Sequence, residues 1–465
     1  MCARLKKPNL YLHHVKHDKE SSSKVSDTKK PPEKKNVKCL YEKNVGVQQQ
    51  LCSANNLYSL FPPHHHSGGF YNKHRYYSHR QDRCNSNKRV PHSTYSPEGQ
   101  QQSRVDMLMA KFMSRSKFVE MKEMPGSVLA ACEWGTLSKQ IWDAFISCQQ
   151  TEETYKKKLT LWQYLYTFIR NWFPRYGLYL VGSTMSGFGS NTSDVDMCLL
   201  VRPSYVDQRS EALNYLEQIQ HSLKYCDFVD NIELIWAKVP ILKFRDSSRH
   251  LEVDLNCNNA VGIRNTHLLH CYANIDWRVR PLVLIVKLWA SANNINDAKN
   301  MTISSYSLAL MVIHYLQCGV APPVIPCLHG LYPGKFLPDS DIHSIDMQEQ
   351  LIPFHSDNNQ TLGELLLGFL RYFATFNYAV HAISVRLGAR IPIDECRLAR
   401  SHKNDPHQWK HLCIEEPFDL TNTARSVYDP QIFQRIKSVF IASHNRLERT
   451  RDLITIFQFD NIDKL

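Results

Sequence analysis

The chain has 465 residues, 43% of them apolar, which suffices for two or three packed units. Its formal net charge of +12 lies almost wholly in residues 1–100, where 18 Lys and Arg face 7 Asp and Glu, so the near-neutral remainder must hold any polyanion through local patches. The 14 cysteines include no C-x-x-C pair and no apolar run approaches the ~20 residues of a membrane span, which argues against zinc ribbons, disulfide scaffolds and membrane insertion.

Residues 1–105 are predicted to be a disordered basic tail. They are rich in Lys, Ser, Asn, Gln and His, and no apolar period persists in them. The run KKPPEKK at 29–35 fits a nuclear localisation signal or, alternatively, a plain solvated segment. The start of the chain has no apolar core of a signal peptide. We therefore expect a cytoplasmic protein, with a nuclear fraction as an open alternative.

Order is expected to begin near Val105, where apolar residues start to recur at helical spacing. A small group of strands follows two helices, and the rest of the chain is helical. This order predicts an α+β fold with a small mixed sheet and a helical unit. The expected elements are helices at 127–149 and 152–173, strands at 177–181 and 195–201, a helix from Pro203 to about Tyr225, two strands around Pro240, a strand at 251–256, and helices at about 279–293, 305–318, 361–376 and 430–452.

The stretch YLVGSTMSGFGSNTSDVDMCLLV at 179–201 carries the first functional signal. It is not a Walker A loop, because Phe188 and Gly189 stand where a lysine and a hydroxyl residue are needed. It is not a dinucleotide fingerprint either, since Thr192 replaces the third glycine and the segment enters a strand.

A metal site fits this stretch better. Side chains alternate along a strand, so Asp194 and Asp196 point to one face, roughly 6–7 Å apart, while Val195 points to the other. Two such carboxylates can share hard cations such as Mg²⁺. Gly182 allows the backbone to approach a phosphate, which Ser183 can bind. The competing interpretation is a solvated turn.

A third carboxylate is expected from HLEVDLN. Its apolar and polar residues alternate, which predicts a strand with one buried face. Asp254 is the predicted third ligand because it lies at the centre of that strand. The alternative is an ordinary half-exposed strand, whose polar face would also include Glu252.

Together, the Gly-Ser pair, the D-x-D pair and the lone strand aspartate resemble the DNA polymerase β-like nucleotidyltransferases. The segments GIRNTHLLHCYANID, VRPLVLIVKLWA and TISSYSLALMVIHYLQ are similar to terminal nucleotidyltransferases that extend RNA 3′ ends. TLGELLLGFLRYFATF resembles their poly(A)-polymerase-associated segment. The resemblance covers about 125–455 and is strongest to cytoplasmic poly(A) RNA polymerases of the germ-line-development type.

The resemblance implies a division of the chain. Residues 156–290 would form the polymerase β-like catalytic domain. The helical central domain would combine 106–155 with 291–465, including the poly(A)-polymerase-associated segment at about 361–416. The active site would lie in the cleft between the two domains.

The resemblance also implies the site. Asp194 and Asp196 would hold two Mg²⁺ or Mn²⁺ ions, and Asp254 would bind the ion that activates the RNA 3′-hydroxyl. Phosphate and nucleoside contacts would come from Gly182, Ser183, Asn265, Lys287, Ser305 and Tyr306: Gly182 and Ser183 on the phosphates, Asn265 on the ribose 2′-hydroxyl, Lys287 and Ser305 on the β/γ-phosphates, and Tyr306 stacked on the base.

Each nucleotide contact has a structural alternative. Lys287 could extend to solvent from an apolar helix. Asn265 and Ser305 could cap helices, and Tyr306 could simply pack in the core. Many relatives carry a second basic residue where this chain has Ser291, a role that Lys299 could take over.

The activity implied by the resemblance is template-independent transfer of AMP from ATP to the 3′ end of mRNA. Uridine-adding relatives carry a histidine after the EEPF segment, where this chain has Thr421, Asn422 and Thr423, so adenine is favoured. A terminal uridylyltransferase, an inactive scaffold of the same fold and an enzyme acting on small molecules remain as alternatives. Because the body is near neutral and has no RNA-recognition motif, we expect an RNA-binding adaptor protein to deliver the transcript.

Overall fold

The computed structural model describes residues 97–125, 133–173, 176–201, 208–237, 239–347, 349 and 351–457. Most of the predicted tail lies outside these residues. Helix α1 (Pro97–Arg115) begins before the predicted start of order near Val105. The polar residues that open α1 have no apolar period, but Pro suits a first helical position and Gln and Glu are good helix formers, so the helix extends back from buried Val105.

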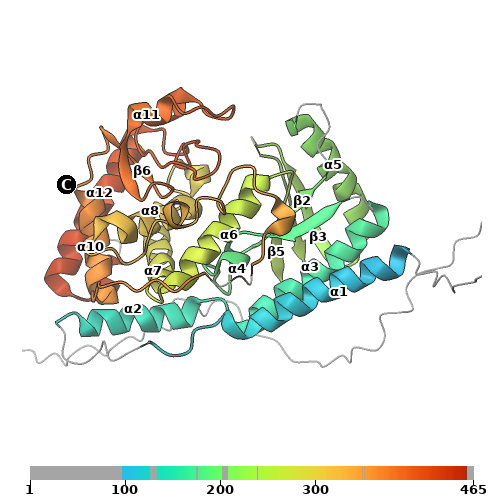
Figure 1. The fold of residues 1–465 in the computed structure, drawn as a ribbon, viewed down its shortest axis with the longest axis horizontal. Coiled ribbons are helices and arrows are strands. Elements are labelled where there is room, and N and C mark those ends of the chain that lie inside the picture. The colour runs from blue at the N-terminus through green and yellow to red at the C-terminus, as the bar shows by residue number, and fades with distance from the viewer. Residues whose placement is uncertain are drawn as a thin grey trace, which may run out of the picture. The chain divides into compact units, whose positions relative to one another are not determined.

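A five-stranded mixed sheet carries the predicted aspartates (Figure 1). Its order is β1 (Gly177–Leu180), β2 (Val195–Leu200), β5 (Leu251–Cys257), β4 (Ile241–Asp246) and β3 (Val229–Ile235). β2 and β5 are parallel, and the other neighbouring pairs are antiparallel. The irregularity between β3 and β4 lies at Asp230–Glu233, whereas Pro240 only precedes β4. The predicted α+β fold is confirmed.

Two helices bury their apolar residues in the core of this sheet. α3 (Glu152–Trp172) contributes Trp162, and α5 (Gln208–Leu223) contributes Leu216. They join Val195 and Val253, which lie on the apolar face of β2 and β5. Because side chains alternate along a strand, burying these valines turns the aspartates beside them to the opposite face.

A larger core joins the helices that follow and precede the sheet in sequence. The strongest packing is between α10 and α12 and between α7 and α8 (Figure 1). The helices that contribute are α2 (Gly135–Cys148), α6 (Ala260–Ile275), α7 (Val279–Ala292), α8 (Ser305–His314), α10 (Leu362–Ala374) and α12 (Pro430–Thr450). None of the helices in the described part of the chain is long and apolar enough to cross a bilayer.

Helix α6 was missing from the sequence prediction. His267 and His270 are buried in it beside apolar residues, so its sequence lacks a clear polar face. α6 and α7 pack in the larger helical core, although residues 156–290 were assigned to the catalytic domain. The predicted domain boundaries thus assign α6 and α7 to the catalytic domain with the sheet, whereas their apolar side chains pack in the helical core.

Several short elements were also not predicted. Each of them is only three to five residues long, which is too short for a repeating pattern of apolar residues to be recognised in the sequence. They are α4 (Ser183–Ser186), α9 (Leu328–Leu331), α11 (Ile393–Arg397), the hairpin of β6 (His381–Ser384) and β7 (Ala389–Pro392), a π-helical turn at Tyr315–Gly319 that follows α8, and 3₁₀ turns at Ser116–Phe118, Ala298–Asn300, Ile342–Ser344, Pro406–Gln408 and Leu453–Ile456.

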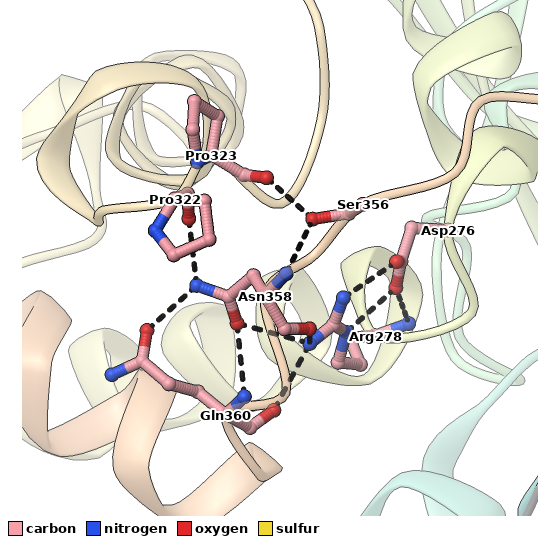
Figure 2. Close-up of polar contacts among 7 residues, drawn as sticks. All are labelled: Asp276, Arg278, Pro322, Pro323, Ser356, Asn358 and Gln360. Carbon is pink, nitrogen blue, oxygen red and sulfur yellow. Dashed lines mark hydrogen bonds and ion pairs between the residues drawn. The ribbon is translucent and has the colours of Figure 1, made fainter.

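A buried polar cluster ties the irregular segment before α10 to the turn between α6 and α7 (Figure 2). Arg278 pairs with Asp276 at 2.8 Å and donates to the carbonyls of Asn358 and Gln360 at 2.8 and 3.0 Å. The amide of Asn358 donates to the Pro322 carbonyl at 2.8 Å. Since Arg278 and Asn358 are both buried, their contacts satisfy groups that water does not reach.

Candidate active site

Helix α4 begins directly beside the second aspartate of the D-x-D pair. Gly182, which precedes it, has φ of +69°, and a β-carbon there would lie 2.1 Å from Oδ2 of Asp196. Only glycine therefore fits at this position. Its N–H donates to Thr266 Oγ1 at 2.9 Å, and the Ser183 N–H donates to the Asp196 carboxylate. The Gly-Ser pair thus adjoins the acidic side chains, as the sequence pattern indicated.

The structure brings the three predicted aspartates together. Asp196 and Asp254 are directly paired across the parallel strands β2 and β5. Asp194 immediately precedes β2, two residues from Asp196. All three side chains are partly exposed, whereas Val195 and Val253 are fully buried. Strand alternation, which the sequence showed, is the reason for this arrangement.

Lys243 is a member of the site that the sequence reasoning missed. Its Nζ lies 3.2 Å from both Asp194 Oδ2 and Asp254 Oδ1. Lys243 is paired with Asp254 across β4 and β5, so it points to the same face of the sheet. The alternation of Lys243 with buried Leu242 and Phe244 was a signal that could have located it.

The negative charge of Asp196 is disfavoured by burial and by repulsion from the two neighbouring carboxylates. Burial, followed by the charges of Asp254 and Asp194, raises the pKa of Asp196 to about 6, while the Ser183 N–H and Lys158 oppose the rise. Added positive charge would relieve this repulsion.

The donor set fits a divalent ion. Three carboxylates are the hard oxygen ligands that Mg²⁺ and Mn²⁺ prefer. In this structure they are not drawn together to ligand spacing, and neither they nor any other three His, Cys, Asp or Glu side chains among the described residues form a ready-made metal-binding group. The Lys243 ammonium instead supplies positive charge between two of them.

Asn265 and Tyr306, which were predicted to contact the ribose and the base, meet in the structure, and we call this part of the site the nucleoside side after that prediction. Asn265 lies inside α6, whose N-cap is Asn259, so the alternative that Asn265 caps a helix is wrong. Its side chain hydrogen-bonds Tyr306, whose hydroxyl donates to Glu416 Oε1 at 3.0 Å. Burial and the charge of Glu416 raise the pKa of Tyr306 well above its ordinary value. Burial, with Asp419 nearby, raises the pKa of Glu416 to about 7.

Lys287 and Ser305 were both predicted phosphate contacts. Lys287 Nζ donates to the carbonyl of Phe188 at 3.0 Å, so it reaches the loop after α4 instead of solvent. Burial lowers the pKa of Lys287, and Asp196 acts in the opposite direction. Ser305 is exposed and opens α8, whose N-cap is the preceding Ser304.

The remaining sequence candidates have varied surroundings. Ser291 and Lys299 are both exposed, on α7 and on the turn after it. Asn422 is buried, and its Oδ1 accepts from the N–H groups of Ile414 and Ala424 at 3.0 Å each. Asn422 therefore shapes its own loop, which also holds Glu416.

A separate cavity of about 600 Å³ lies against α4. Arg115 and Arg280 line it, and they donate to the carbonyls of Met185 and Gly187. These carbonyls belong to the C-terminal end of α4 and the residue after it, so the arginines hold that end of the helix, whereas Asp196 lies beside Gly182 at its start.

Comparison with known proteins shows which family the chain resembles in sequence and fold. Residues 137–274 match the family model described as poly(A) RNA polymerase, mitochondrial-like, central palm domain, and residues 361–422 match Cid1 family poly A polymerase. A solved GLD-2/RNP-8 complex contains a chain that is 42% identical, with a TM-score of 0.63, covering 71% of this chain and 99% of that one. The chain belongs to the GLD-2 family of poly(A) RNA polymerases.

Curated GLD-2 relatives agree over the same region. Poly(A) RNA polymerase gld-2 homolog A of Drosophila melanogaster is 53% identical over 352 residues, which are 75% of this chain and 26% of the relative. GLD2 of Danio rerio is 44% identical over 321 residues, covering 68% of this chain and 63% of the relative. The chain therefore spans about a quarter of the fly protein and less than two thirds of the fish protein. The predicted family and fold are confirmed.

A more distant member of the superfamily bears on base choice. A histidine-to-asparagine variant of the Cid1 poly(U) polymerase was solved with MgATP, and it is 27% identical with a TM-score of 0.58. It covers 70% of this chain and 99% of its own. Nucleotide-bound structures of this kind show that the fold holds a nucleoside triphosphate and, in that case, magnesium.

Proposed function

We propose that this GLD-2 family chain is a template-independent RNA 3′-adenylyltransferase that adds AMP from ATP to the 3′ ends of mRNA. The observation that carries the proposal is the convergence of Asp194, Asp196 and Asp254 beside the Gly-Ser helix start. A catalytically inactive scaffold of this fold has no need of three carboxylates on one exposed face. The identity with relatives named poly(A) RNA polymerase supports the reaction class.

Each element of the site has a task in this reaction. Asp194, Asp196 and Asp254 would hold two divalent ions, Mg²⁺ or Mn²⁺. When bound, these ions neutralise phosphate charge and lower the pKa of the attacking 3′-hydroxyl. Gly182 and Ser183, at the start of α4, would contact the triphosphate, with the Ser183 hydroxyl as the polar group. Asn265 and Tyr306 form a polar and aromatic surface for the ribose and base.

Adenine is the proposed base. The segment after EEPF holds Thr421, Asn422 and Thr423 and no histidine. The Cid1 variant solved with MgATP also has an asparagine in place of a histidine, which supports adenine acceptance where histidine is missing. A uridylyltransferase is the second candidate, supported by the solved poly(U) polymerases of the same fold.

The proposed partners are the mRNA 3′ end, ATP and an RNA-binding adaptor protein. GLD-2 chains have been solved in complexes with RNP-8 and with GLD-3, which supports a protein partner for this chain too. The near-neutral body makes weak, strongly salt-dependent RNA binding the expectation for the chain alone. The proposed location is the cytoplasm, with a nuclear fraction as the alternative.

A 3′-extension assay tests the proposal directly. The full chain is incubated with a short RNA and each of the four NTPs separately, with Mg²⁺, with Mn²⁺ and with chelator. We expect extension with ATP that requires a divalent ion. Preferential extension with UTP would favour the second candidate, and no extension with any NTP, even with an adaptor present, would contradict the enzyme assignment.

A further inference from the structure

Lys158 is a fully buried cation that neither the sequence prediction nor the proposed mechanism uses. It lies on α3 with 0% exposure, directly under the loops that flank the acidic cluster. Lys156 and Lys157, two residues and one residue earlier, have side chains that are 44% and 52% exposed and pair with glutamates on the same helix. A lysine is rarely buried without a carboxylate partner, so this position requires an explanation.

The surroundings of Lys158 match an ammonium group. Its Nζ donates to Gln150 Oε1 and Ser193 Oγ at 3.0 Å each and to Thr184 Oγ1 at 3.4 Å. Ser193 gives its own hydroxyl proton to the Ser190 carbonyl, and Gln150 offers its amide oxygen, so both are acceptors here. Three donors meeting three oxygen atoms satisfy the charged form of a lysine.

These acceptors belong to both halves of the metal site. Thr184 follows Ser183 at the start of α4, and Ser193 precedes Asp194. The loop between them closes tightly, because a β-carbon on Gly189 would lie 3.0 Å from the Ser183 carbonyl oxygen. The ammonium group of Lys158 therefore links α4, which adjoins Asp196, to Ser193, which immediately precedes Asp194.

The charge of Lys158 acts on the carboxylates across a short gap. Among the described residues it forms no ion pair, so its positive charge is not consumed by direct contact. Burial lowers the pKa of Lys158 to about 8, and the charges of Asp196 and Asp194 oppose that fall. Lys158 in turn opposes the rise in the pKa of Asp196. The cluster of three aspartates thus has a fixed counter-charge on its buried side.

We infer that Lys158 is a positioning residue for the divalent-ion site. It fixes Thr184 and Ser193 relative to each other, and its charge limits how tightly the three aspartates hold metal. The inference rests on the proposed function, because it assigns Lys158 a part in that site. Moderate affinity suits ions that must accompany an incoming nucleotide and leave with pyrophosphate.

The test compares the full chain with Lys158→Met, which keeps the length of the side chain and removes the charge. Mn²⁺ binding is titrated by EPR without RNA, and extension kinetics are measured separately. We expect the Mn²⁺ dissociation constant of Lys158→Met to fall roughly three- to tenfold, while kcat falls at least about fivefold because the loops lose their shared contact. Lys157→Met, on the exposed side of the same helix, should change neither quantity.

Ser193→Ala separates positioning from charge, since it removes one acceptor and keeps the ammonium. We expect a lower kcat with unchanged Mn²⁺ affinity and an unchanged melting temperature. If Lys158→Met does not fold, the kinetics of Ser193→Ala are the test, and an unchanged kcat of Ser193→Ala overturns the inference. If Lys158→Met folds and its Mn²⁺ affinity equals that of the wild type, the inference is overturned. This holds even if activity falls, provided that it falls only in proportion to the amount of folded protein. Failure of the wild type to extend RNA would contradict the proposed function instead, and the Mn²⁺ titrations would still report on Lys158.

Discussion

The acidic side and the nucleoside side of the site are built differently. Asp196 and Asp254 lie on paired strands, where alternation alone decides which way they point. Asn265 and Tyr306 lie on two helices, and Glu416, which accepts a hydrogen bond from Tyr306, comes from a loop 110 residues after Tyr306 in the chain. The first arrangement follows from local geometry, while the second exists only when the helical core has formed.

The acidic side should be the more sensitive to single changes. Asp196→Ala is expected to reduce extension more than about 100-fold, because it removes a carboxylate from the centre of the cluster. Its melting temperature should not fall, since a crowded negative charge is lost. Glu252→Ala is the matched control, because Glu252 lies on the neighbouring strand β5, two residues from Asp254, and its one ion pair among the described residues is an exposed contact with Arg245 at 3.8 Å. Equal loss of activity in both variants would contradict the assignment.

The nucleoside side should instead depend on the scaffold that holds α6. Arg278→Met leaves Asp276 and two carbonyls without their partner, so the free energy of unfolding should fall by about 3–5 kcal/mol. Arg397→Met, which breaks an exposed pair with Asp394 and one hydrogen bond to the Trp409 carbonyl at 2.9 Å, should cost only about 1–2 kcal/mol. Urea unfolding of the two variants measures the difference, and similar losses would show that the cluster in Figure 2 is not a special support.

Glu416 gives the nucleoside side a pH dependence. Because folding raises its pKa to about 7, the folded protein binds a proton that the unfolded chain releases above about pH 4.3. This contribution to stability is present at low pH and is lost as the pH rises through 7. In the wild type the free energy of unfolding should therefore fall between pH 5 and pH 8, and Glu416→Gln should reduce this fall by up to about 3 kcal/mol. Urea unfolding at pH 5 and pH 8 measures it, and identical pH slopes in both proteins would disprove it.

The smallest expected effect concerns Tyr306. Tyr306→Phe removes the hydroxyl that donates to Glu416 and keeps the ring, so we expect a loss of about 1 kcal/mol of nucleotide binding, a roughly fivefold higher KM for ATP. kcat should change less than KM. A drop in kcat comparable to that of Asp196→Ala would erase the distinction between the two sides.

The difference between local geometry and contacts of distant segments also explains which structural features could be predicted from the sequence. The strands of the sheet, its aspartates and the long amphipathic helices followed from period and residue type. Helix α6 did not, because its buried histidines hide its period. Lys243 and Lys158 were missed because a lysine in a strand or helix is usually solvated, and only their neighbours show otherwise.

The sequence by itself determined that Asp194 and Asp196 share a face, that Asp254 lies opposite Val253 on its own strand, and that a glycine precedes the serine of α4. These are consequences of backbone geometry within a few residues. Only the tertiary structure decided that Lys158 lies beneath two loops, that Lys243 lies between two carboxylates, and that Tyr306 reaches Glu416. Contacts between distant segments depend on how whole elements pack, which local periodicity does not encode.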